Sequence, residues 1–530
     1  MTAASTTIDT PRLFAGRLHL WAFVLGCAAV TAGVLLHAPM FLMARDMGYR
    51  LAGMPMGLGM TIGMFLIVAG IGMAGFGLLP GKVQAAAIPV VVSPPEDAPL
   101  TASHWWLMAV LVMALVVDVM KPASLGFVVP GMIAEYQVSK AVEAWLPFSA
   151  LLGTFLGSIA WGVLADVYGR RASLLLAAVM FVGTSICGAM PSFWWNVFMC
   201  FLMGAAAGGF LPVAYALLAE IMPTRHRGWC LVLVGGLGAI GGYLAASGLS
   251  ALLQPTFGWR IMWFLNLPSG LLVILMSCWI PESAKFLLSR GYAAQAHVIL
   301  KRFGSVVRPL APDEVEETHP EIAAPPLGRE YLGKTLALTV AALAWSLINF
   351  GILLWLPNDL VAKGYDVAAS SRLLGASALI AFPTVFVAAA LYSRWSTKWS
   401  LALSVAITAA GLVWILALDA APPGTMSPVA PVALLIVGSN ALLAIVLPYT
   451  AETFPLRVRG RATGWIAGCS KLGGLIAQVL GIAGAIPALG LSAIYVLVPT
   501  VLSIGLIAVF GSETRGRDLR ELDRAHHGRR

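Results

Sequence analysis

The chain contains few charged residues. Asp, Glu, Lys and Arg together make up 11% of its 530 residues, whereas a soluble globular domain carries about 25%. Hydrophobic residues account for 59% of the chain, and the mean hydropathy is +0.87. This composition excludes an ordinary water-soluble protein and predicts a polytopic membrane protein.

Cysteines and enzyme motifs are also scarce. The six cysteines form no C-x-x-C pair and all fall inside apolar stretches, which argues against a disulfide or metal framework. The sequence has no G-x4-G-K-[ST] phosphate loop, no G-x-S-x-G elbow and no histidines at metal-ligand spacing. We therefore expect no enzyme activity and no bound cofactor or metal.

Long apolar runs take up most of the chain. A membrane-spanning helix needs roughly 20 mostly apolar residues. Fourteen stretches meet this requirement: 19–43, 57–79, 105–131, 144–164, 172–190, 193–219, 229–252, 260–280, 333–357, 371–392, 399–419, 428–450, 462–484 and 488–510. The sequence thus predicts an all-α membrane protein with fourteen spans.

The net charge of +9 is better explained by membrane topology than by nucleic-acid binding. Basic residues gather in alternate short loops, in the 281–334 loop and in the tail after Arg515. Because Lys and Arg collect on cytoplasmic loops, we expect both termini in the cytoplasm and a location in the cell inner (plasma) membrane. Arg45 and Arg50 fit this topology less well, since they would lie outside.

The two halves of the chain repeat one another. The pattern E-x-x-P-x-x-x-R-G starts at Glu220 and recurs at Glu452, 232 residues later. Glu282 of "PESAK" matches Glu513 of "SETRG" at an offset of 231. Nearly constant offsets indicate that a six-span unit has been duplicated.

Three motifs add a family resemblance. "GVLADVYGRR" (162–171), "AEIMPTRHRG" (219–228) and "PESAKFLL" (281–288) resemble motifs of the major facilitator superfamily of transporters, in particular its sugar-porter and aromatic-acid:proton symporter branches. The resemblance covers about 104–520. It implies two six-helix bundles that rock around a central cavity and expose a midplane site to each side in turn.

The spans and linkers suggest seven segments. They are a cytoplasmic tail (1–17), an extra transmembrane hairpin (18–80), a Pro-rich linker (81–103), an N-terminal six-helix bundle (104–281), a cytoplasmic inter-bundle loop (282–332), a C-terminal six-helix bundle (333–511) and a basic cytoplasmic tail (512–530). The hairpin has no counterpart in either half.

The motif at 162–171 carries a candidate conformational latch. Asp166 lies at a predicted helix end beside Arg170 and Arg171, and Gly169 permits a tight turn. Such a carboxylate can pair with a cation or helix N-terminus of the other bundle and hold one conformation. The alternative is a solvated loop whose basic residues only set topology.

Further charged residues extend this candidate latch. Glu220 can pair with Arg227, and Glu452 with Arg459, as similar charge relays in the two halves. Glu282 of the "PESAK" motif belongs to the same set.

Two charges interrupt the first core span. Asp118 and Lys121 lie three residues apart, on one face of a helix. Each costs about 2.5–3.5 kcal/mol near a bilayer centre, so neither is expected to face lipid. Either they form a buried pair that fixes helix packing, or Asp118 exchanges a proton and Lys121 binds an anionic substrate.

The resemblance adds detail at this position. Aromatic-acid proton symporters carry a D-G-x-D pattern in this helix, and Asp118, twelve residues before Pro130, matches its first acid. Lys121 stands in place of the second acid, and a cation there suits a substrate that bears a carboxylate. Cys200 stands where the family often has an arginine.

Four further residues are candidates to line the cavity. Lys471 lies deep in the eleventh core span, Asn349 and Asn440 in the seventh and tenth, and Trp345 can stack on a ring. The alternatives are snorkelling or pairing for the lysine, interhelical hydrogen bonds for the asparagines and core packing for the tryptophan. Arg260, at the start of a span, is interpreted as an interfacial anchor.

The extra hairpin is rich in methionine. Three methionines fall on one helical face and three on another: Met40, Met43 and Met47, then Met56, Met60 and Met64. Thioethers can select Cu(I), although such stripes are more often adaptable packing surfaces. Gly59 and Gly63 form a small-xxx-small pair suited to close helix contact.

The sequence thus predicts a secondary active transporter for a small organic solute, with a carboxylate or other organic anion as the favoured class. It would work by alternating access, with proton-coupled uptake through Asp118 as one mode. Three alternatives stay open: a multidrug or metabolite exporter on the same fold, a non-transporting receptor or assembly factor that docks a partner through the hairpin, and copper transport through its methionines. The expected partners are a small molecule, a proton and the lipid bilayer, with no nucleic acid.

Overall fold

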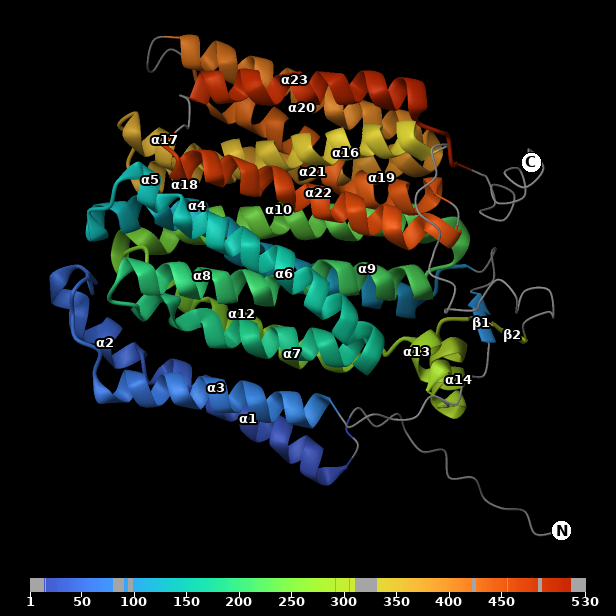
Figure 1. Cartoon of the computed structure of the whole chain (residues 1–530), viewed down its shortest axis with the longest axis horizontal. Coiled ribbons are helices and arrows are strands. Elements are labelled where there is room, and N and C mark those ends of the chain that lie inside the picture. The colour runs from blue at the N-terminus through green and yellow to red at the C-terminus, as the bar shows by residue number, and fades with distance from the viewer. Residues whose placement is uncertain are drawn as a thin grey trace.

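The computed structural model consists of long, roughly parallel helices (Figure 1). It describes residues 14, 16–79, 90–93, 99–290, 292–304, 306–309, 331–421, 426–454, 456–484 and 489–515. Within these ranges, fourteen helical stretches are long and apolar enough to cross a membrane. The predicted number of spans is confirmed.

The N-terminal bundle contains six of these spans. They are α4 (Ala102–Tyr136), α6 (Trp145–Tyr168), α7 (Arg170–Gly183) with the 3-10 helix η2 (Thr184–Ala189), α8 (Phe193–Ala207) with α9 (Phe210–Ile221), α10 (Thr224–Phe257), and α11 (Ile261–Phe264) with α12 (Asn266–Met276) and η3 (Ser277–Trp279). The short helix α5 (Lys140–Glu143) leads from α4 into α6.

The C-terminal bundle contains six more. They are α16 (Leu332–Leu347) with the π-helix η5 (Ile348–Leu353) and α17 (Leu356–Ala362), α18 (Val367–Ala381) with α19 (Thr384–Arg394), α20 (Thr397–Ala420), α21 (Val429–Thr453), α22 (Leu456–Ile482) and α23 (Leu489–Phe510). This is the two-bundle architecture that the duplication predicted.

The remaining two spans form the extra hairpin. It comprises α1 (Arg17–Leu35), α2 (Ala38–Met43), η1 (Ala44–Met47) and α3 (Leu58–Leu78). In Figure 1 the hairpin (blue) and the C-terminal bundle (yellow to red) lie on opposite sides of the N-terminal bundle. Ile67, Ile71 and Val30 of the hairpin pack against Gly183 at the end of α7.

Glycines allow α1 and α3 to pack backbone to backbone. A Cβ at Gly26 would lie 2.6 Å from the Gly70 carbonyl oxygen, and one at Gly33 would lie 2.6 Å from that of Gly63. Both contacts leave no room for a side chain, as in close helix pairs in membranes. Of the predicted Gly59 and Gly63 pair, only Gly63 makes such a contact, since the nearest atom to a Cβ at Gly59 is 3.9 Å away.

A buried ion pair holds the loop of the hairpin against the N-terminal bundle. Glu135 accepts hydrogen bonds from the backbone N–H groups of Leu51 (2.7 Å) and Ala52 (2.9 Å), and from the Arg260 guanidinium (2.6 Å). Arg260 is fully buried and also donates to the Met190 carbonyl. The interpretation of Arg260 as an interfacial anchor is wrong, because its charge is paired inside the protein.

A small antiparallel sheet departs from the all-α expectation. Strand β1 (Val90–Ser93), within the predicted Pro-rich linker, pairs with β2 (Val306–Pro309), within the predicted inter-bundle loop. Two short helices, α13 (Ala284–Ser289) and α14 (Ala293–Arg302), precede β2. The predicted Pro-rich linker and the predicted inter-bundle loop are therefore joined by backbone hydrogen bonds.

The two bundles meet along several helix pairs. Helix α10 packs against α18, α19 and α21, while α6 packs against α22 and α4 against α17. We call the end that carries the 166–171 loop and α13 the motif end, and the end that carries α5 and α17 the opposite end (Figure 1). Contacts between bundles occur at both ends: Gly126 lies against the Leu354 carbonyl, and Gly228 lies against Glu452.

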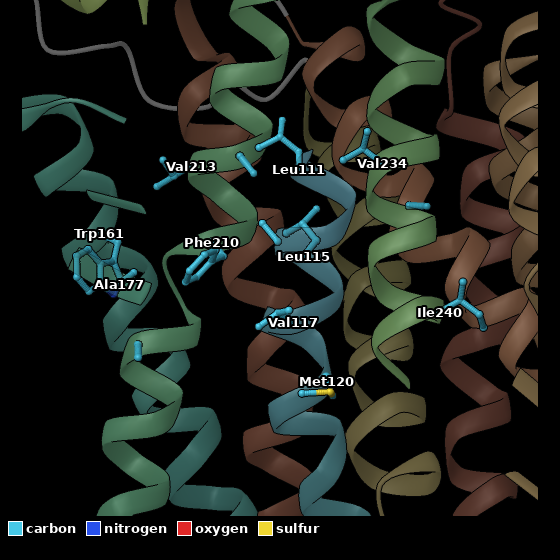
Figure 2. Packing of buried hydrophobic residues seen from close by; sticks show 14 of the residues in the cluster. Leu111, Leu115, Val117, Met120, Trp161, Ala177, Phe210, Val213, Val234 and Ile240 are labelled. Atoms are coloured by element: carbon cyan, nitrogen blue, oxygen red, sulfur yellow. The ribbon is translucent and has the colours of Figure 1, made fainter. Parts of the chain in front are cut away.

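Helix α4 runs through the centre of the N-terminal bundle. Figure 2 shows its residues Leu111 and Leu115 between Val213 of α9 and Val234 of α10. The glycine-rich sequence of α10 lets α4 approach closely, since a Cβ at Gly238 would lie 2.5 Å from that of Leu115. This packing fixes the rotation of α4 and therefore the directions of its two charged side chains.

Candidate functional site

Asp118 is a buried carboxylate on the central helix α4. Its side chain is 6% exposed, and its Oδ1 atom has no hydrogen-bond partner within the described ranges. The charges that act on it are those of Lys471, the stronger, and Lys121. A buried carboxylate oxygen without a partner is costly when ionised, which makes Asp118 suited to carrying a proton.

Lys121 is bound by residues of its own bundle. Its ammonium donates to the Phe181 carbonyl oxygen (2.9 Å) and to the Thr184 hydroxyl, and it lies 4.3 Å from the centre of the Phe181 ring. The side chain is fully buried, and the described residues contain no ion pair between it and Asp118. Lys121 therefore ties α4 to α7 and η2 within one bundle.

Lys471 is placed differently. Its ammonium lies 5.9 Å from the centre of the Trp345 ring and 5.8 Å from that of Phe350. No carboxylate lies within ion-pair distance of Lys471 in the part of the chain that the structure describes. The opposite charge that acts on it is that of Asp118, in the other bundle. Opposite charges on α4 and α22 thus act on each other without a direct pair.

A π-helix shapes the aromatic side of this site. Helix α16 changes to the π-helical segment η5 immediately after Leu347, and η5 carries Asn349 and Phe350. Trp345 is 4% exposed and packs edge-to-face on Phe350, with 5.7 Å between ring centres. Local π-helices are frequent at functional sites. Asn349 is half-buried on this segment.

Helix α22 contributes one face to the bundle interface. A Cβ at Gly474 would lie 2.7 Å from Phe350 and 3.0 Å from Leu151 of α6, so this position lies where both bundles meet. Lys471 and Gln478 flank Gly474 at helical spacing on the same face. We did not expect Gln478 from the sequence, although a glutamine seven residues after an intramembrane lysine is a signal that could have identified it.

Asn440 bridges the bundles. Its side-chain amide, on α21, donates to the Gly236 carbonyl of α10 at 3.3 Å. This is the interhelical hydrogen bond that was the alternative to substrate contact. A donor shared between bundles can break when they move, so the bond itself belongs to one conformation.

At the motif end, the charges of the N-terminal bundle bind one another. Arg170 pairs with Asp166 (3.0 Å) and Glu220 (2.8 Å), and Ser283 donates to Glu220. The Asp166 side chain is 74% exposed, and its partner within the described residues is Arg170 of the same bundle. Here Asp166 supports the loop and makes no hydrogen bond or ion pair with the other bundle in the described part of the chain.

Glu282 caps α7. Its carboxylate accepts hydrogen bonds from the backbone N–H groups of Arg170 (2.7 Å) and Arg171 (3.2 Å). Gly169 has φ +103°, and a Cβ there would lie 2.5 Å from the Glu282 carboxylate, so this turn requires glycine. Burial raises the pKa of Glu282, against these donors.

Glu513 repeats this arrangement in the C-terminal bundle. It accepts from the backbone N–H (3.0 Å) and hydroxyl (2.7 Å) of Thr397, at the start of α20, and from the hydroxyl of Ser396. Although burial opposes ionisation, these bonds, Ser396 first, lower the pKa of Glu513 to about 2. The offset of 231 in the sequence therefore corresponds to equivalent helix caps.

At the motif end, Glu452 is a carboxylate that lies against the other bundle. It accepts hydrogen bonds from Tyr392 (2.6 Å) and Thr514 (2.9 Å), and a Cβ at Gly228 of α10 would lie 2.5 Å from its oxygen. Its charge also acts on Arg227 of the N-terminal bundle, more strongly than that of Glu220 does. The side chain of Arg459, its expected partner, lies outside the described residues.

The methionines of the hairpin do not share one environment. Met43 and Met47 are exposed, while Met60 is buried. His37 is buried and bonds through Nδ1 to the Gly33 carbonyl (2.8 Å). The residues that the structure describes contain no group of three or more His, Cys, Asp or Glu side chains arranged for a metal ion.

Comparison with known families agrees with this geometry. The sequence model of the Major Facilitator Superfamily matches residues 107–478. The chain belongs to the major facilitator superfamily. The resemblance seen in the sequence motifs is confirmed, and the chain is a multi-pass membrane transporter of that superfamily.

Superfamily members similar to this chain include transporters of aromatic acids. The niacin transporter NiaP of Acinetobacter baylyi is 25% identical over 449 residues, which cover 82% of this chain and 99% of that protein. The gallate transporter of Pseudomonas putida is 26% identical over 424 residues, covering 76% and 92%. The 4-hydroxybenzoate transporter PcaK of Pseudomonas putida is 29% identical over 231 residues, covering 42% and 48%.

Solved structures in the superfamily share the fold. The inward open conformation of the xylose transporter XylE from E. coli matches with a TM-score of 0.61 at 18% identity, covering 80% of this chain and 99% of that one. Its partially occluded inward open conformation matches with a TM-score of 0.64 at 17% identity, covering 79% and 100%.

Proposed function

We propose that the chain moves a small organic anion, a carboxylate on an aromatic ring, by alternating access between the two bundles. The observation that carries this proposal is Lys471, whose ammonium lies beside the rings of Trp345 and Phe350 and has no ion-pair partner among the described residues. A carboxylate supplies the missing charge, and a flat ring attached to it can pack on the two aromatic side chains.

The relatives support this substrate class. Three of them are transporters of niacin, gallate and 4-hydroxybenzoate, and each of these compounds is an aromatic ring with a carboxyl group. A cation next to aromatic walls is the complementary arrangement. Lys121, whose ammonium is bound by α7 and η2, contributes to the structure of the N-terminal bundle in this proposal.

Asp118 provides the coupling to a proton. When it is ionised, its negative charge competes with the substrate carboxylate for Lys471, because both anions act on the same cation. Protonation of Asp118 removes this competition and favours substrate binding. Proton and anion therefore bind together and cross together, which is symport.

Alternating access requires contacts that form at one end and break at the other. We assign this role at the motif end to Glu452 with Arg227, and at the opposite end to Asn358 of α17, which donates to Glu143 of α5 at 3.3 Å. The motif end faces the cytoplasm of the plasma membrane in this proposal, with both termini on that side, because basic loops collect there.

Counterflow in proteoliposomes tests the proposal. Vesicles loaded with unlabelled 4-hydroxybenzoate should take up external labelled 4-hydroxybenzoate with a transient overshoot, after subtraction of protein-free vesicles. Loading with the neutral amide 4-hydroxybenzamide should give none. An overshoot driven by lipophilic cations instead would support the exporter, and no overshoot with any solute would support a receptor; either result would overturn the proposal.

A further inference from the structure

Gln478 presents a buried hydrogen-bond acceptor that no residue in the described part of the chain uses. The residue is fully buried on α22, and its Nε2 atom donates to the Phe350 carbonyl at 2.7 Å. This bond fixes the orientation of the amide, because a carbonyl oxygen can only accept. Its Oε1 atom is left without a partner among the described residues. Leaving such a buried group unpaired is costly and calls for an explanation.

The position of Gln478 connects it with Lys471. The two residues are separated by two helical turns, about 10.5 Å of rise, on the α22 face that meets the other bundle at Gly474. Both also contact the same residue, since Lys471 lies beside the Phe350 ring and Gln478 binds the Phe350 carbonyl. A ring with substituents at opposite ends can therefore reach from one polar group to the other along Phe350.

We propose that Gln478 is a specificity-determining residue, which selects aromatic carboxylates that carry a hydrogen-bond donor on the ring opposite the carboxyl group. The inference rests on the proposed function, because Lys471 must hold the carboxylate. The Oε1 atom accepts the hydrogen bond from the donor, for which a phenolic hydroxyl is the simplest chemistry. The π-helix η5 presents both the Phe350 ring and its carbonyl to α22, which aligns the two ends of the site.

The chemistry gives an order of affinities. A ligand with a para hydroxyl satisfies the Oε1 atom, and a ligand with hydrogen in that position leaves it unpaired. A ligand with a para methoxy group offers only another acceptor, so two oxygens face each other without a proton. Sites built to bind a polar substrate group reject analogues that lack it, because their own buried groups are left unpaired. The expected order is 4-hydroxybenzoate, then benzoate, then 4-methoxybenzoate.

Calorimetric binding to the purified full-length protein tests this order. In the wild type, 4-hydroxybenzoate should bind about tenfold more tightly than benzoate and more tightly still than 4-methoxybenzoate. In Gln478→Met, which keeps the volume and removes the acceptor, the ratio between hydroxybenzoate and benzoate should fall below threefold. Using ratios within one protein cancels any general effect of the substitution on the site.

Gln254 supplies a matched control. It is a buried glutamine on α10 whose Nε2 atom also donates to a phenylalanine carbonyl, that of Phe127, at 3.1 Å. Gln254→Met should leave the ratio at its wild-type value. If Gln478→Met fails to fold, the wild-type order alone decides: equal affinities for the hydroxy and methoxy ligands would overturn the inference. Absence of binding by all three carboxylates would instead overturn the proposed function.

Discussion

At the scale of single residues, the two intramembrane lysines solve the same electrostatic problem in opposite ways. Burying an ammonium in a low-dielectric interior is costly unless acceptors replace its water. Lys121 has a carbonyl, a hydroxyl and an aromatic ring from its own bundle. The ammonium of Lys471 lies beside two aromatic rings and makes no hydrogen bond to any residue that the structure describes. The cation that lacks acceptors is the one able to bind an anion.

Replacing Lys471 by methionine should weaken binding of 4-hydroxybenzoate by roughly 10- to 100-fold, since a hydrogen bond to a charged group contributes about 1.5–3 kcal/mol. Calorimetry or thermal-shift titration measures the effect. The matched control is Lys363→Met: this lysine is paired with Asp359 (2.9 Å) and Asp419 (3.0 Å) at the opposite end, and these carboxylates, against partial burial, raise its pKa. Equal affinities of the two variants would remove Lys471 from the site.

Which lysine faces the other bundle could not be predicted from the sequence. Hydropathy and spacing correctly identified Asp118, Lys121 and Lys471 as charges inside spans. Whether each one faces a neighbour in its own bundle or the other bundle depends on helix rotation. That rotation is set by close contacts such as Gly238 against Leu115, and these arise only when the chain is folded.

At the scale of elements, the extra hairpin is built as part of the N-terminal bundle. Helices α1 and α3 contact each other at glycines, and both also pack against α7. The loop between them donates backbone hydrogen bonds to Glu135. The sequence predicted two additional spans and close helix packing. It gave no sign of the docking, because Glu135 and the loop are 84 residues apart and connect through backbone N–H groups.

Glu135→Gln should release the loop of the hairpin. Removing one charge of a buried pair costs about 3–5 kcal/mol, since the partner is left unpaired. Faster hydrogen exchange at Leu51 and Ala52 and a lower unfolding temperature are the expected results. Asp359→Asn serves as control, because its ion pair is partly exposed and such pairs contribute only about 0–1 kcal/mol. Unchanged exchange at the loop in Glu135→Gln would show that the ion pair does not hold it.

At the scale of the whole molecule, duplication explains the symmetry and also where it fails. Glu282 and Glu513 cap equivalent helices in the two bundles. Glu220 and Glu452 also occupy equivalent positions, but Glu220 binds within its bundle while Glu452 lies against Gly228 of the other one. The sequence repeat predicted both pairs of carboxylates. The asymmetry depends on the relative placement of the bundles, which no local pattern encodes.

Glu452→Gln should favour opening at the motif end, because it removes the charge that faces Arg227. Spin labels at the exposed positions 225 and 394 report the separation of the bundles there. We expect the ratio of open to closed populations, measured as long and short distances between the labels, to rise about fivefold, which is equivalent to about 1 kcal/mol. Glu220→Gln, its repeat equivalent, should leave the distance distribution unchanged. A shift of the same size in both variants would argue against a latch formed by Glu452.

Proton uptake on substrate binding tests the coupling of Asp118 to the anion site most directly. Calorimetry with 4-hydroxybenzoate, in buffers of different ionisation enthalpy and from pH 5 to pH 9, counts the protons bound with each ligand. The wild type should take up a growing fraction of one proton per ligand as the pH rises and Asp118 becomes ionised in the free protein. Asp118→Asn should bind the ligand with no proton uptake at any pH. Proton uptake by Asp118→Asn equal to that of the wild type would contradict the proposed role of Asp118.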